Sequence, residues 1–171
     1  SGIPHGQGQL MAVMDGHGGD AVAEKVARML PSAFEAALRR TGGDVESALR
    51  LAVEALNDAT RAEQAGSTLS VVYVAQDEAR AHVAAIGDSP VVIVNDAGEL
   101  HVSPEHNVRS NPDELDAARA RGAIYEGGYI RDPATGYGLQ MSRALGDRDL
   151  DRVLSREPEI YSVPLGPESV I

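Results

Sequence analysis

The sequence has no cysteine and no tryptophan, and it contains a single phenylalanine among its 171 residues. Without cysteine the chain can form no disulfide bond, offers no thiolate to a metal ion and has no cysteine nucleophile. Aromatic residues make up only 4% of the chain, so we expect a core of aliphatic side chains. The absence of thiols is compatible with the cytoplasm, which we take as the expected location.

The sequence also has few basic residues and no long apolar stretch. Its 15 lysines and arginines face 26 aspartates and glutamates, which gives a formal net charge of −11. An acidic surface repels nucleic-acid phosphates and anionic lipids, so we expect no nucleic-acid partner and no membrane partner. No apolar run approaches the roughly 20 residues that cross a bilayer. We expect most of the carboxylates to serve solubility and a few to gather as ligands of divalent cations.

Hydrophobic spacing and helix-capping residues predict two long helices and a shorter third one. The two long helices are expected over residues 20–38 and 44–65, each beginning at an aspartate cap. The third begins at Asn111, ends before Gly122 and includes Glu114, which is placed to close a capping box. Three helices with such clear ends indicate that helical layers form a large part of the fold.

Short β-branched and alternating runs predict several strands between and after the helices. Residues 1–9, which hold three glycines and a proline, are interpreted as a loop. Paired helices followed by antiparallel strands indicate a single α+β domain and not a repeat of parallel βαβ units. The predicted strands cover residues 10–14, 67–75, 80–86, 91–95 and 99–102, with short pieces near 125–130, 137–141 and 160–163.

The string Asp15-Gly16-His17-Gly18-Gly19 directly follows the first predicted strand. A buried strand delivers a carboxylate to a fixed point, and the glycines allow the backbone to turn close to a ligand. Mg²⁺ and Mn²⁺ prefer carboxylate and carbonyl oxygens, so Asp15 can bridge two such ions while the Gly16 carbonyl binds one. His17 would then lie beside a bound phosphate, where it can protonate a leaving alkoxide. The alternative is an ordinary turn in which Asp15 caps the next helix.

Two further segments carry acidic side chains in glycine-bounded turns. Asp88 lies in Ile86-Gly87-Asp88-Ser89 between two predicted strands, and Asp147 ends the stretch Ser142-Arg143-Ala144-Leu145-Gly146-Asp147. Turns favour all of these residue types, so each segment taken alone is mostly turn chemistry.

The order and spacing of these segments resemble those of the metal-dependent protein serine/threonine phosphatases of type 2C, the PPM family. The resemblance runs from about residue 10 to the end of the chain. Six blocks carry it: residues 11–19 (MAVMDGHGG), 66–69 (GSTL), 85–89 (AIGDS), 103–106 (SPEH), 138–147 (GLQMSRALGD) and 157–160 (EPEI).

The resemblance implies an αββα sandwich, in which two antiparallel sheets pack face to face with helices outside. It also implies a pair of Mn²⁺ or Mg²⁺ ions that activate a water molecule, which attacks phosphoserine or phosphothreonine in a protein substrate directly. Asp15 matches the bridging metal ligand and Gly16 the carbonyl ligand. His17 matches the general acid, and Asp88 matches the ligand of a third, more weakly bound ion.

The sequence departs from the family pattern in several places. It lacks the N-terminal segment with an acidic ligand and a phosphate-binding arginine, and the C-terminal Asp-Gly and Asp-Asn segments, so we expect a domain truncated at both ends. Pro90 stands where arginine is usual and Glu105 where aspartate is usual. His106, which follows Glu105, is interpreted as structural.

Three functions follow from this comparison. The first is a protein serine/threonine phosphatase, and the second is a phosphatase-like module that binds a phosphoprotein or another partner without hydrolysing it. The third is a phosphatase that acts on small phosphoesters. The departures leave two origins open, a piece of a longer phosphatase or a naturally short member of the family. The substrate and the oligomeric state do not follow from the sequence.

Overall fold

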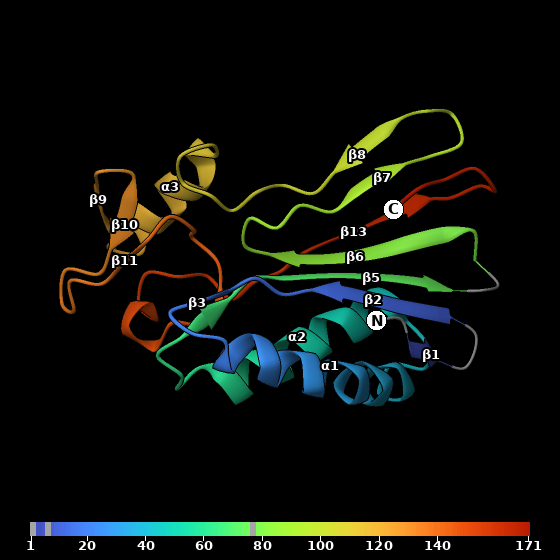
Figure 1. Ribbon diagram of the computed structural model, residues 1–171, viewed down its shortest axis with the longest axis horizontal. Helices are drawn as coiled ribbons and strands as arrows, with labels where there is room; N and C mark the ends of the chain where they lie inside the picture. Colours follow the sequence, from blue (N-terminus) through green and yellow to red (C-terminus); the bar gives the residue numbers. More distant parts are fainter. Residues whose placement is uncertain (1–2, 6–7, 76–77) are drawn as a thin grey trace.

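The computed structural model describes residues 3–5, 8–75 and 78–171, and its centre is a five-stranded antiparallel sheet (Figure 1). The strand order is β1-β2-β5-β6-β13, so the two ends of the described chain flank strands from its middle. The strands are β1 (Ile3–His5), β2 (Gly8–Val13), β5 (Leu69–Ala75), β6 (Arg80–Ile86) and β13 (Glu159–Pro164).

Helices α1 (Ala21–Arg40) and α2 (Val45–Thr60) cover one face of this sheet, below it in Figure 1. Side chains alternate between the two faces of a strand, and Val71 and Tyr73 of β5 are buried in the same cluster as the helices. The Phe34 ring of α1 packs on the Tyr73 ring, with ring centroids 4.9 Å apart. Aliphatic side chains supply almost all of the remaining core, as the composition predicts.

The predicted end of the second helix, at residue 65, was wrong, because α2 ends at Thr60. The carbonyl oxygens of Glu63 and Ala65 accept hydrogen bonds from the backbone N–H groups of Arg148 and Asp147, at 3.0 and 2.9 Å. These residues are therefore tied to a distant loop instead of continuing the helix. Among the helices of the described residues, none is both long enough and apolar enough to cross a membrane.

A hairpin of β7 (Val92–Val94) and β8 (Leu100–Val102) lies over part of the opposite face of the sheet (Figure 1). Val72 of β5 and Ile93 of β7 are buried there in a second apolar cluster. Helices therefore lie outside one face of a sheet, and antiparallel strands lie against the other. This arrangement confirms the predicted α+β class with antiparallel sheets.

A smaller lobe lies beyond one end of the central sheet, at the left of Figure 1. It has its own apolar cluster, which includes Ala118 and Ile130, both completely buried. The lobe consists of α3 (Pro112–Ala120), β9 (Ile124–Glu126), β10 (Tyr129–Arg131) and β11 (Gly138–Leu139).

A three-stranded sheet of very short strands joins three parts of the sequence near this end. Its strands are β3 (Gly16–His17), β4 (Gly66–Ser67) and β12 (Leu145–Gly146), with β4 in the middle. The short helix η1 (Arg148–Leu150) follows β12 directly. The small sheet brings His17 beside residues that lie far from it in the sequence.

Two predicted boundaries were wrong for reasons visible in the backbone pairing. Residues 1–9 were expected to be a loop, of which residues 1–2 and 6–7 lie outside the part that the structure describes. Ile3–His5 instead forms β1, which pairs with β2. The strand expected over residues 67–75 is interrupted at Thr68. The Thr68 N–H and hydroxyl are hydrogen-bonded to the backbone of Asp15, at 3.0 Å each, so β4 and β5 separate there.

The Phe34–Tyr73 contact provides a test of the core between helices and sheet. We expect Phe34→Ala to lower the free energy of unfolding by about 3–5 kcal/mol, because Phe34 is 0% exposed and its removal leaves a cavity. Leu100→Ala is the control, since Leu100 is 65% exposed and its loss should change stability by less than about 0.5 kcal/mol. Urea unfolding of both variants measures the difference, and similar losses would contradict this assignment of the core.

Candidate functional site

Asp15 follows the end of β2 and is held by its backbone alone. Its N–H donates to the Thr68 hydroxyl at 3.0 Å, and its carbonyl oxygen accepts from the Thr68 N–H at 3.0 Å. The residue is exposed, and no described side chain donates a hydrogen bond to its carboxylate. The result is a carboxylate on a fixed backbone whose oxygen atoms are available to a ligand.

Asp88 lies in the turn after β6, and its neighbours Gly87 and Ser89 lie against Thr68. Gly87 has a φ of +98°, and a side chain there would collide with Thr68, with only 2.7 Å between its Cβ and the threonine methyl carbon. The Thr68 hydroxyl, which binds Asp15, also lies 2.8 Å from the Ser89 hydroxyl. One buried threonine therefore connects the two segments that carry the predicted metal ligands.

The Asp88 carboxylate is half-buried, and one of its oxygens has a protein partner. The Asn107 side-chain amide donates to Asp88 Oδ2 at 2.9 Å. Asn107 precedes α3, so this bond links the predicted ligand to the smaller lobe. The other carboxylate oxygen, Oδ1, has no hydrogen-bond partner among the described residues.

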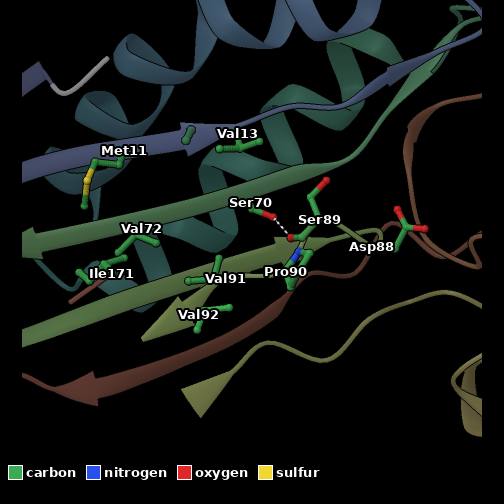
Figure 2. A pocket seen from close by; sticks show the side chains of 11 residues that line it. Met11, Val13, Ser70, Val72, Asp88, Ser89, Pro90, Val91, Val92 and Ile171 are labelled. Atoms are coloured by element: carbon green, nitrogen blue, oxygen red, sulfur yellow. Dashed lines mark hydrogen bonds between the residues drawn. The ribbon is translucent and has the colours of Figure 1, made fainter. Parts of the chain in front are cut away.

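A groove of about 550 Å³ runs along the sheet face from the Asp88 turn (Figure 2). Asp88 lies at one end of it, and Met11 and Ile171 lie at the other. The Ser70 hydroxyl donates to the Ser89 carbonyl oxygen at 2.5 Å near the acidic end. The remaining lining is mostly aliphatic, so only the Asp88 end offers ligands to a cation. The lining residues are Met11, Ala12, Val13, Ser70, Val72, Asp88, Ser89, Pro90, Val91, Val92 and Ile171.

His17 is paired with a residue that the sequence did not identify as part of the site. Its Nε2 atom lies 2.6 Å from Oδ2 of Asp147, which is nearly buried in the loop after β12. The two residues are 130 positions apart in the sequence. Asp147 belongs to a block that indicated the family, but no local pattern predicted this contact.

A separate group of His106, Glu114 and Glu159 has ligand atoms within 4.8 Å of one another, a spacing at which side chains can hold a metal ion. However, the Arg143 guanidinium already contacts both carboxylates, at 2.5 Å to Glu114 and 3.4 Å to Glu159. The Gly87 N–H donates to His106 Nδ1 at 2.9 Å, so in the neutral ring the proton is on Nε2. Metal-binding histidines show the opposite arrangement, in which the second ring nitrogen donates to an acceptor.

This group is therefore best described as a buried ion-pair network. His106 is completely buried, and burial together with the nearby Arg143 charge lowers the pKa of its imidazole. Burial alone would raise the pKa of Glu114, but hydrogen bonds from Arg143 and Ser142 outweigh it and leave the pKa below its ordinary value. The network supports the structural interpretation of His106.

Glu114 does not close the capping box that the sequence predicted. Asn111 caps α3 through a side-chain oxygen that accepts from the Glu114 N–H at 3.4 Å. The Glu114 carboxylate instead turns into the protein and accepts hydrogen bonds from Ser142 and Arg143. The Asn111 N–H, which a capping box would use, already donates to the Asn107 carbonyl oxygen at 2.9 Å, and the largely buried Arg143 guanidinium is a stronger partner for the carboxylate.

Comparison with known proteins places the whole arrangement in one family. A family model described as Protein phosphatase 2C matches residues 5–170. Probable protein phosphatase 2C 45 of Oryza sativa subsp. japonica is 34% identical over 162 residues, which cover 88% of this chain and 53% of the relative. Probable protein phosphatase 1N of Homo sapiens is 33% identical over 178 residues, covering 98% of this chain and 39% of the relative.

Solved structures show the same fold. A sex determining protein of C. elegans has a TM-score of 0.79 and 26% identity, covering 95% of this chain and 41% of that chain. The serine-threonine phosphatase 2C of Toxoplasma gondii also has a TM-score of 0.79, with 19% identity, and covers 98% of this chain and 67% of that chain. The chain spans between about a third and about half of the length of the curated relatives it matches.

The ion pair of Glu114 with Arg143 generates a stability prediction. We expect Glu114→Gln to lower the free energy of unfolding by about 3–5 kcal/mol, because it leaves the largely buried Arg143 without its main counter-charge. Asp113→Asn, an exposed neighbour on the same helix, is the control and should have little effect.

The ion pair of Glu114 with Arg143 also makes the difference in unfolding free energy between wild type and Glu114→Gln dependent on pH. Because the pKa of Glu114 is lower in the folded protein, its stabilising effect is complete above the ordinary value of 4.5 and is lost as the pH falls through the folded value. Urea unfolding in neutral and in progressively more acidic buffers should show the gap between wild type and Glu114→Gln closing. A gap that stays constant into acid would contradict the ion-pair account.

Proposed function

The chain belongs to the protein phosphatase 2C family, and on this basis we propose that it removes phosphate from phosphoserine and phosphothreonine of phosphoproteins with Mn²⁺ or Mg²⁺ as cofactor. The observation that carries the proposal is the Thr68 hydroxyl, which links the Asp15 backbone to the Ser89 turn beside Asp88. Two acidic segments of the family pattern thus meet at one end of the sheet.

The residues at this end have the donor chemistry that Mn²⁺ and Mg²⁺ prefer. Asp15 offers a carboxylate without a described donor, and Gly16, an exposed residue of β3, offers a main-chain carbonyl. Asp88 offers one carboxylate oxygen beyond its bond to Asn107. Asp15 and Gly16 would hold a binuclear pair, and Asp88 would hold a third, weaker ion. When bound, such ions lower the pKa of a water molecule and neutralise phosphoryl oxygens.

Two further requirements of the reaction are a proton for the leaving oxygen and a group that attacks the phosphorus. His17 lies two residues beyond Asp15, with its side chain 25% exposed, and we assign it the proton that the leaving serine or threonine oxygen requires. The sequence offers no cysteine that could form a phosphoenzyme. Direct attack by water on the phosphorus is therefore the reaction that these residues favour.

Measuring the phosphatase activity of the full protein tests this proposal. We expect hydrolysis of a phosphothreonine peptide with Mn²⁺ or Mg²⁺ and none with excess chelator. Asp15→Asn should reduce the rate by at least about 10²-fold, because it weakens the bridging ligand. Asp20→Asn is the matched control, since Asp20 is exposed nearby and its side chain makes no capping bond.

Three outcomes separate the alternatives. Hydrolysis that persists in chelator would overturn the metal-dependent mechanism. Equal activity of Asp15→Asn and Asp20→Asn would overturn the assignment of Asp15. Tight binding of the phosphopeptide by a folded protein without turnover at any Mn²⁺ concentration would favour the non-catalytic binding module instead.

A further inference from the structure

The contact between His17 and Asp147 is shorter than an ordinary N–H···O hydrogen bond, at 2.6 Å between Nε2 and Oδ2. The side chain of His17 is 25% exposed, whereas that of Asp147 is 9% exposed. A partly exposed histidine is thus hydrogen-bonded to a carboxylate that has little access to water. Such a contact restrains both the position of the ring and the nitrogen that carries its proton.

Asp147 is held by a backbone conformation that non-glycine residues seldom adopt. Its φ is +52° and its ψ is +51°, in the left-handed region. Its N–H donates to the Ala65 carbonyl oxygen at 2.9 Å, and its own carbonyl oxygen accepts from the Leu150 N–H at 2.9 Å. These two bonds fix the backbone that carries the carboxylate, and such a backbone conformation persists only where the surrounding structure holds it.

Gly66 makes room for the pair. A β-carbon at this position would overlap both the His17 Nε2 atom and the Asp147 Oδ2 atom. Gly66 is the partner of His17 in the register of β3 with β4 and of Gly146 in the register of β4 with β12. The small sheet therefore brings histidine and carboxylate together across a position where only glycine fits.

The hydrogen bond assigns different tasks to the two ring nitrogens. A carboxylate only accepts hydrogen bonds, so Nε2 of His17 carries a proton that it donates to Asp147. The Nδ1 atom has no hydrogen-bond partner among the described residues. Nδ1 is thus the nitrogen through which His17 can exchange a proton with a bound molecule.

We propose that Asp147 is a positioning residue, which holds the His17 ring with Nε2 protonated and so presents Nδ1 to the leaving oxygen of the phosphoester. This inference rests on the proposed phosphatase function. In the step concerned, His17 enters with protons on both ring nitrogens. The oxygen of the attacking water forms a bond to phosphorus as the bond from phosphorus to the serine or threonine oxygen breaks. That leaving oxygen takes the proton from Nδ1, which leaves a neutral His17 ring protonated at Nε2, and the protons of the water remain with the phosphate product. Asp147 gives up and receives no proton and touches no substrate.

The first experiment requires no activity. Long-range ¹H–¹⁵N NMR spectra report which ring nitrogen of a histidine carries the proton, and we expect the neutral His17 ring to be protonated at Nε2. In Asp147→Asn the amide can donate as well as accept, so we expect a mixture of the two tautomers. A wild-type ring protonated at Nδ1 would overturn the proposal, and this measurement remains decisive even if the variant fails to fold.

The second experiment compares substrates that differ in their leaving group. Asp147→Asn should slow hydrolysis of a phosphothreonine peptide by roughly 10²–10⁴-fold, the range expected for general acid catalysis. The loss should be much smaller for an aryl phosphate, whose leaving oxygen needs little protonation. Asp149→Asn is the matched control, because Asp149 pairs with the adjacent Arg148 and has no contact with His17.

A double-mutant cycle separates positioning from a general structural role. If Asp147 acts through the imidazole, Asp147→Asn should not slow hydrolysis further in a His17→Ala background. Equal losses on both substrates, or a full additional loss in that background, would overturn the proposal. If the wild-type protein hydrolyses neither substrate, the proposed function fails, and the NMR result alone decides the role of Asp147.

Discussion

A single buried hydroxyl, that of Thr68, holds together the two segments that carry Asp15 and Asp88. It accepts from the Asp15 N–H and contacts the Ser89 hydroxyl, at 3.0 and 2.8 Å. The same residue interrupts what would be one continuous strand, because its own N–H turns to the Asp15 carbonyl oxygen. The end of β2 and the turn after β6 thus meet at a residue that is only 1% exposed, and these two segments carry Asp15 and Asp88.

Positions without side chains make this close assembly possible. Gly87 lets its turn pass against Thr68, and Gly66 leaves space for the contact between His17 and Asp147. In both cases the neighbouring atoms would occupy the volume of a β-carbon. The same turn contacts the network around Glu114, because the Gly87 N–H donates to the buried His106. Fixed backbone, and not long flexible side chains, therefore sets the geometry of the site.

Local physical chemistry explains which features the sequence could predict. The caps at Asp44 and Asn111 and the strand over Arg80–Ile86 depend on neighbouring residues, and the structure has them as expected. The inward turn of Glu114 and the pairing of His17 with Asp147 depend on partners 29 and 130 residues away. No spacing rule selects such partners, because a distant arginine or a glycine in a third strand decides the outcome.

We propose that metal ions bind at the end of the sheet marked by Asp15 and Asp88, whereas the group around His106 is an ion-pair network. Anomalous diffraction at the manganese absorption edge, from crystals grown with Mn²⁺, distinguishes these two places. We expect the strongest peaks against the Asp15 carboxylate and a weaker one near Asp88. A peak among His106, Glu114 and Glu159, or none beside Asp15, would contradict the account.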